Sequence, residues 1–207
     1  MRMGIDFDNT IACYDGAFHA AAVARGLIPV EVEADKTSVR DYLRRQGRDA
    51  DFTALQGYVY GPGMQHVSVF PGLSQSLRRF LNAGWELFVI SHKTKVPFAG
   101  PPYDLHAAAR AFLADQGLVG SADAPFTADR IRFEPTLADK IARIAALDCA
   151  VFIDDLPEVL GAPDFPADTR RILFDPQGHH QGGGSAGFER HGDWRSLTEA
   201  ILAVEGA

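Results

Sequence analysis

Hydrophobic and polar residues follow two different patterns along this chain. Between residues 14 and 68 the apolar positions recur at helical spacing, and no short apolar run typical of a buried strand interrupts them. From Gly72 onwards, helical stretches alternate with short apolar runs, and glycines end several of the helices. The first pattern predicts a helical segment, and the second predicts repeated helix–strand units.

The expected strands are short and apolar, and the expected helices carry an apolar stripe. Strands are predicted at residues 3–7, 85–90, 131–133, 149–153 and 171–174. Helices are predicted at residues 14–26, 38–47, 52–58, 72–84, 104–116, 136–147 and 196–204. This alternation is typical of an α/β fold with an open, mostly parallel sheet of about five strands and helices on both faces.

Composition and charge narrow the class of protein. Of the 207 residues, 46% are hydrophobic and 23% are charged, which is typical of one sizeable globular domain or a domain with an insertion. The net charge of −7 argues against nucleic acid as the partner, because that binding needs clusters of basic residues. No apolar run is long enough for a membrane span, and no signal-peptide pattern is present. Cys13 and Cys149 lack a metal-ligand or redox spacing, so we expect a cytoplasmic protein.

The first predicted strand ends in two aspartates one residue apart. Because side chains alternate along a strand, Asp6 and Asp8 are expected to point toward the same side. Two carboxylates repel each other unless a cation or a shared proton compensates them, which indicates a metal site or an acid/base pair. A turn and helix cap formed by residues 8–10 is the alternative.

Other polar residues follow the later strands. Ligands of parallel α/β sheets bind at the carboxyl ends of the strands, so these residues are candidates for one site. The second strand is followed by Ser91, His92 and Lys93, and the fourth by Asp154 and Asp155. A turn for Ser91 and a helix cap for the two aspartates are the alternatives.

Lys140 is a further candidate, although no strand ends beside it. It lies on the apolar stripe of the helix that begins at Thr136, one turn from the start. A lysine there either extends its ammonium group outward to solvent or points into the site. Lys93 is the rival candidate for the same cationic role.

Taken together, these residues resemble the four ordered motifs of the haloacid dehalogenase-like (HAD) superfamily. The matching residues are Asp6-Phe-Asp-Asn-Thr10, the strand ending in Ser91, the isolated Lys140, and the strand ending in Asp154-Asp155. The resemblance implies a Rossmann-like core at residues 1–13 and 69–207, and a small helical cap inserted at residues 14–68.

The resemblance also implies a role for each motif residue. Asp6 would be the nucleophile and Asp8 the general acid/base. Ser91 and Lys140 would bind phosphate, with His92 and Lys93 as further candidates, since the His92-Lys93 pair departs from the commonest family pattern. Asp6, Asp8, Asp154 and Asp155 would form the Mg²⁺ site.

The implied activity is that of a Mg²⁺-dependent phosphatase that hydrolyses a small phosphorylated metabolite through an aspartyl-phosphate. The carboxylate at Asp8 resembles the phosphatase branch of the superfamily, because the dehalogenase branch lacks it. The strings at residues 55–60, 90–94 and 153–157 resemble a HAD subgroup encoded near surface-polysaccharide genes, which favours sugar phosphates. A phosphotransferase or mutase, and a non-catalytic phosphate-binding regulatory module, remain as alternatives.

Two regions outside the motifs carry further expectations. The cap would contact the substrate, with candidates at Arg40, Tyr42, Tyr58, Tyr60 and His66. The loop at residues 178–192 is rich in glycine and is expected to be mobile. Its histidines at positions 179, 180 and 191 would suggest zinc, but no cysteine accompanies them.

Overall fold

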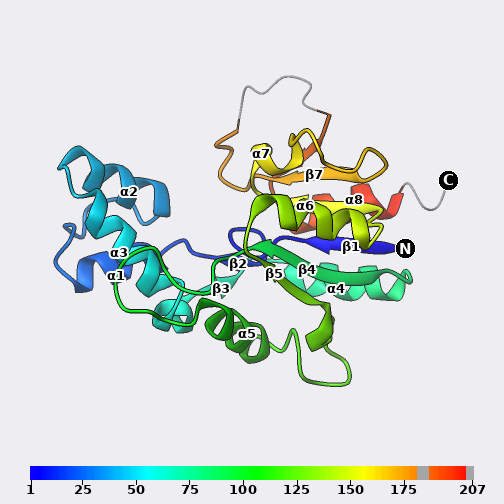
Figure 1. Ribbon diagram of the computed structural model, residues 1–207, viewed down its shortest axis with the longest axis horizontal. Helices are drawn as coiled ribbons and strands as arrows, with labels where there is room; N and C mark the ends of the chain where they lie inside the picture. Colours follow the sequence, from blue (N-terminus) through cyan, green and yellow to red (C-terminus); the bar gives the residue numbers. More distant parts are fainter. Residues whose placement is uncertain (181–186, 204–207) are drawn as a thin grey trace. The chain divides into compact units, whose positions relative to one another are not determined.

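The computed structural model of the protein describes residues 1–180 and 187–203 (Figure 1). The chain divides into two compact units. The first, here called the core unit, consists of Met1–Ile11, Val69–His92 and Gly117–Ala207. The second, here called the helical unit, consists of Ala12–Ser68 and Lys93–Gln116.

The core unit is built on a six-stranded sheet in which all neighbouring strands are parallel. The strand order is β5-β4-β1-β6-β7-β8, so β1 lies in the interior of the sheet. The strands are β1 (Arg2–Ile5), β4 (Glu86–His92), β5 (Ile131–Glu134), β6 (Val151–Asp154), β7 (Arg170–Phe174) and β8 (Glu189–His191). The chain passes from β1 to β4 and β5 on one side and then returns to β6 on the other side. Such a reversal creates a crevice at the carboxyl ends of the strands, where ligands bind.

Four α-helices belong to the core unit: α4 (Leu73–Asn82), α6 (Leu137–Ala146), α7 (Pro157–Leu160) and α8 (Trp194–Ala203), and the short η2 (Ala128–Arg130) precedes β5. One hydrophobic cluster joins α6 and α7 to the sheet, with Ile141 and Ile144 packed among residues that include Phe88 and Phe152. Gly4 makes this packing possible, because a Cβ atom there would lie 2.5 Å from the Phe152 ring. The apolar stripe predicted for α6 is therefore the surface that fixes this helix on the sheet.

The helical unit contains α1 (Ala17–Ala24), α2 (Lys36–Arg45), α3 (Asp49–Val59), η1 (Pro62–His66) and α5 (Leu105–Asp115). The short strands β2 (Ala12–Cys13) and β3 (Ser68–Val69) pair with each other. Val39, Leu43, Phe52 and Leu55 are buried where α2 packs on α3. No helix in the part of the chain that the structure describes has the length and apolar character needed to cross a membrane.

The structure confirms the α/β fold with a parallel sheet and a helical insertion, and differs from the sequence prediction in four details. The sheet has a sixth strand, β8, inside the segment predicted as a mobile loop; residues 181–186 of that loop lie outside the described residues. Strand β1 ends at Ile5 rather than Phe7. Helix α2 begins at Lys36 because Asp35 accepts a hydrogen bond from the Ser38 N–H at 2.8 Å, two residues before the expected start. Residues 93–116, expected in the core, group with the helical unit.

Candidate active site

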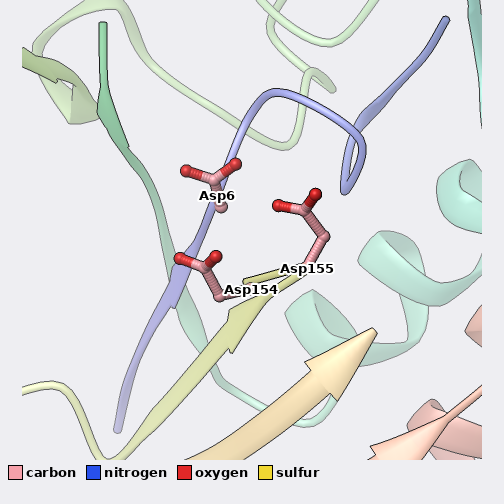
Figure 2. A group of neighbouring side chains, drawn as sticks. All are labelled: Asp6, Asp154 and Asp155. Carbon is pink, nitrogen blue, oxygen red and sulfur yellow. The ribbon is translucent and has the colours of Figure 1, made fainter. Parts of the chain in front are cut away.

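Three carboxylates lie together at the carboxyl ends of β1 and β6. Asp6 follows β1, Asp154 is the last residue of β6, and Asp155 comes next. Ile5 of β1 pairs in register with Ile153 of β6, so the two strands end side by side. Each of the three residues offers an oxygen atom within 4.8 Å of the others, and Figure 2 shows their carboxylates gathered at this point. We call these residues the carboxylate cluster.

Lys140 on α6 contacts two members of the carboxylate cluster. Its Nζ lies 2.5 Å from Asp6 Oδ1 and 2.6 Å from Asp154 Oδ2, and its side chain is only 2% exposed. Thr136 fixes the start of α6, because its Oγ1 accepts a hydrogen bond from the Asp139 N–H at 3.1 Å. Lys140 therefore points inward from the first turn of the helix instead of toward solvent.

Burial and charge together change the protonation of the site. Burial raises the pKa of Asp6 to about 7; Lys140 opposes the rise, and the charges of Asp154 and Asp8 add to it. Burial also raises the pKa of Asp154, again against the effect of Lys140. Burial alone would lower the pKa of Lys140, but the charges of Asp154 and Asp6 outweigh it and raise the pKa. Lys140 is thus a cation at neutral pH.

Hydrogen bonds hold the cluster in place. Asp154 Oδ1 accepts from the Leu156 N–H at 2.9 Å, so this residue also stabilises the turn into α7, as a capping aspartate would. Asn9 Nδ2 donates to Asp155 Oδ2 at 3.2 Å. Asn9 has a positive φ of 56°, a left-handed conformation that asparagine tolerates better than most residues. The sequence analysis placed Asn9 in a turn and in the first motif, but gave it no role in the site.

Asp8 is not a member of the carboxylate cluster. It is half-buried in the loop after β1, and the three-carboxylate group contains Asp6, Asp154 and Asp155 without it. Its charge nevertheless contributes to the raised pKa of Asp6, so the two carboxylates influence each other. The expected place of Asp8 among the metal ligands therefore stays a prediction.

The candidates that follow β4 have different surroundings. Ser91 is buried in β4, which pairs directly with β1. His92 is exposed, and its Nε2 lies 3.1 Å from the carbonyl oxygen of Pro135. Lys93 belongs to the helical unit, where its Nζ lies 4.8 Å from the centroid of the Tyr60 ring. Lys140 forms ion pairs with two members of the carboxylate cluster, and the choice between the two lysines as phosphate binder stays a prediction.

The chemistry of the cluster fits a small divalent cation. When all three carboxylates are ionised, one ammonium group leaves two negative charges uncompensated, and oxygen atoms are the ligands that Mg²⁺ prefers. The histidines of the glycine-rich loop have other surroundings: the backbone N–H groups of His179 and His180 donate to Asp175, at 2.9 and 3.1 Å. Within residues 1–180 and 187–203, the carboxylate cluster is the one group of three or more side chains with metal-ligand spacing.

No protein-family model matches the sequence, and no curated protein matches it either. Solved structures match over almost the full length. A HAD family hydrolase from Deinococcus radiodurans R1, solved with bound phosphate and sodium, aligns with a TM-score of 0.62 and 16% identity over 99% of this chain and 96% of that chain. A predicted phosphatase from Clostridium acetobutylicum aligns with a TM-score of 0.52 and 16% identity over 98% of both chains.

An L-2-haloacid dehalogenase is also similar, with a TM-score of 0.57 and 15% identity over 97% of this chain and 98% of that chain. At these identities the likeness establishes the fold and leaves the reaction open. Three observations lead to the same fold: the order of the strands, the helical insertion after β1, and these full-length alignments. The protein therefore has the fold of the haloacid dehalogenase-like superfamily of hydrolases.

Proposed function

We propose that the protein is a Mg²⁺-dependent phosphatase that hydrolyses a small phosphorylated metabolite, with a sugar phosphate as the favoured substrate class. The observation that carries the proposal is the carboxylate cluster with Lys140 inserted between two of its members. A nucleophilic carboxylate needs its charge and that of the phosphoryl group screened before the two can meet. The cluster combines a buried carboxylate, a fixed ammonium group and a place for a divalent cation.

Asp6 is the proposed nucleophile. Mg²⁺ held by Asp6, Asp154 and Asp155 would supply the charge neutralisation that lets an anionic substrate approach. One oxygen of Asp6 attacks phosphorus, and a bond forms between them while the bond from phosphorus to the leaving oxygen breaks. Lys140 orients the attacking carboxylate through its contact with Asp6.

Asp8 is the proposed general acid and base. It gives its proton to the leaving alkoxide, and then takes a proton from the water that attacks the phosphorus of the aspartyl-phosphate. Hydrolysis returns Asp6 to a carboxylate and releases phosphate. Ser91, beside β1 in the sheet, would donate a hydrogen bond to a phosphoryl oxygen.

Two of the similar structures support a phosphatase. The hydrolase from Deinococcus radiodurans contains bound phosphate, and the protein from Clostridium acetobutylicum is a predicted phosphatase. Because a dehalogenase is also among the similar structures, the fold alone does not identify the reaction. Asp8 favours phosphate chemistry, because a leaving alkoxide needs a proton whereas a leaving halide does not. We also propose that residues 14–68 form a cap that supplies selectivity for the substrate.

Hydrolysis of p-nitrophenyl phosphate tests the proposal directly. We expect activity that requires Mg²⁺, is removed by a chelator, and is lost in Asp6→Asn. Asp123→Asn is the matched control, because it removes an exposed carboxylate of the same unit and should leave the rate unchanged. Absence of metal-dependent activity on this and a panel of metabolite phosphates would overturn the proposal.

The same assay separates the two alternatives. A phosphotransferase would give more p-nitrophenol than free phosphate when an alcohol acceptor is added, because part of the phosphoryl group passes to the acceptor. A non-catalytic module would bind phosphate but release no p-nitrophenol. Equal amounts of phosphate and p-nitrophenol with acceptors present would support the phosphatase.

A further inference from the structure

A histidine joins the end of strand β4 to the loop that leads into helix α6. The Nε2 atom of His92, the last residue of β4, lies 3.1 Å from the carbonyl oxygen of Pro135. Pro135 immediately precedes Thr136, the residue that caps α6. Because a carbonyl oxygen accepts hydrogen bonds and donates none, Nε2 must carry a proton and donate it. The start of α6 is thus attached to the sheet.

A second contact holds α6 farther along its length. Glu134 of β5 pairs in register with His92, and its Oε1 lies 2.7 Å from Nε of Arg143 on α6. Arg143 comes three residues after Lys140, so the two side chains leave the helix from neighbouring positions. Two paired strand ends therefore hold α6 before and after Lys140, and all of these residues belong to the core unit.

Lys140 depends on an accurate position of this helix. Its Nζ reaches Asp6 at 2.5 Å and Asp154 at 2.6 Å, and both contacts are buried. Hydrogen bonds from nitrogen to oxygen weaken when the two atoms are more than about 3.2 Å apart. Even a small shift of the first turn of α6 would therefore loosen the contacts between Lys140 and the carboxylate cluster.

The surroundings of His92 indicate that orientation, and not stability, is its main contribution. Its side chain is exposed, so water can replace the hydrogen bond to Pro135 when the imidazole is removed. The lost bond would then cost little stability, but the loop before α6 would no longer be held in one place. Because Nε2 donates to Pro135, it is not available to donate to a phosphoryl oxygen at the same time.

We infer that His92 is a positioning residue, which fixes the start of α6 and thereby holds Lys140 in the carboxylate cluster, rather than binding phosphate itself. The inference rests on the proposed function, in which Lys140 orients the nucleophile Asp6. It assigns to the carboxyl end of β4 a role in shaping the site through the neighbouring helix.

A double-mutant cycle with Lys140→Met tests the inference, with hydrolysis of p-nitrophenyl phosphate as the readout. We expect His92→Leu to lower kcat about tenfold with little change in KM, because misplacement of a catalytic group lowers the rate by up to about a hundredfold. His92→Gln, whose amide nitrogen can donate to the same carbonyl, should restore most of the rate. In the Lys140→Met background, His92→Leu should have little further effect. Arg195→Met, which removes an exposed ion pair from α8, is the matched control.

Two results of this cycle would overturn the inference and leave the phosphatase intact. An equal loss of rate in both backgrounds would mean that His92 acts without Lys140, as a direct phosphate ligand would. An unchanged kcat in His92→Leu would mean that the start of α6 is held without this hydrogen bond.

Acetylation of lysines by acetic anhydride, followed by mass spectrometry, gives a readout that does not depend on activity. Lys140 is 2% exposed and should react slowly in the wild type. In His92→Leu it should react at least about threefold faster, because a loosened side chain opens to solvent more often. Lys95, which is 72% exposed, is the internal reference.

The labelling experiment separates this inference from the proposed function. If no phosphate ester is hydrolysed, the phosphatase fails, and faster acetylation of Lys140 in His92→Leu, reversed in His92→Gln, still supports the positioning role. Equal acetylation of Lys140 in the wild type and in His92→Leu would overturn it.

Discussion

The two charged clusters of the molecule have opposite compositions. In the core unit, one buried lysine lies among three aspartates, so that negative charge is in excess. In the helical unit, two lysines lie around one tyrosine, so that positive charge gathers on an aromatic surface. The first arrangement is suited to holding a cation, whereas in the second the hydroxyl and the ring face of a tyrosine contact the ammonium groups.

The distribution of charge over the chain follows the same division. The helical unit contains nine basic and nine acidic residues, so the net charge of −7 belongs to the core unit. Such a core repels an anionic ligand unless a bound cation compensates the negative charge. Under the proposed function, a cation held by the carboxylate cluster would let this acidic protein act on an anion.

Lys140→Met should produce the largest effect, because it leaves the carboxylate cluster without its cation. Loss of one partner of a buried ion pair costs about 3 to 5 kcal/mol, and we expect this loss in the free energy of unfolding without metal. Activity should fall at least about a hundredfold. Urea denaturation with and without Mg²⁺ measures the first effect, and Mg²⁺ should stabilise the variant more than the wild type.

Lys95→Met is the control for that experiment, since its side chain is 72% exposed and its carboxylate partner lies 4.0 Å away. It should unfold within about 0.5 kcal/mol of the wild type. If Lys140→Met left the free energy of unfolding equally unchanged, Lys140 would not be needed to compensate the negative charge of the carboxylate cluster. The proposed difference in charge between the two clusters would then have no effect on stability.

Asp8→Asn should have the next largest effect, and this effect should be on the catalytic rate rather than on metal binding. Removal of a general acid/base lowers the rate by about a hundredfold to ten-thousandfold. Because Asp8 is outside the group that has metal-ligand spacing, calorimetry with Asp8→Asn should give nearly unchanged Mg²⁺ affinity, whereas Asp155→Asn should weaken it clearly. Equal loss of affinity in both variants would place Asp8 among the metal ligands, as the sequence analysis expected.

The helix–strand alternation of the core unit could be predicted, because apolar runs and helix-ending glycines are signals that depend only on residues close together in the sequence. Strand β8 was not predicted: its segment Glu189–His191 is polar, and it forms a strand only because β7 offers an edge for pairing. Residues 93–116 were assigned to the core because helix α5 has the same apolar stripe as the core helices. An apolar stripe shows that one face of a helix is buried, but it does not identify the unit against which the helix packs.

The site was predictable as far as strand ends could be recognised. Asp6, Asp154 and Asp155 come together because their strands are neighbours, and this follows from the family pattern of the motifs. The contact between Asn9 and Asp155 spans 146 residues, so no local pattern could indicate it. The convergence of Lys36 and Lys93 on Tyr60 is likewise a product of tertiary packing.

Asn9→Gly should have a moderate effect confined to the core unit. Glycine keeps the left-handed backbone at this position and removes only the amide that holds Asp155. Removal of a group that orients a metal ligand usually lowers the metal affinity about tenfold to a hundredfold. We expect a loss of Mg²⁺ affinity near tenfold, because the hydrogen bond between Asn9 and Asp155 is 3.2 Å long. Calorimetric titration with Mg²⁺ measures the effect. An unchanged affinity would show that Asp155 is oriented without Asn9.

Tyr60→Phe should have the smallest effect and sharpens the account of the helical unit. Phenylalanine keeps the ring beneath Lys93 and removes the hydroxyl that lies 2.8 Å from Lys36 Nζ. Because a single hydrogen bond is lost, the free energy of unfolding should fall by only about 1 kcal/mol, which urea denaturation measures. Tyr60→Leu, which also removes the cation–π contacts, is the comparison for the ring itself. A much larger loss of stability in Tyr60→Phe would mean that the contact between Lys36 and the hydroxyl, rather than the packing of the ring, is the main support of this part of the helical unit.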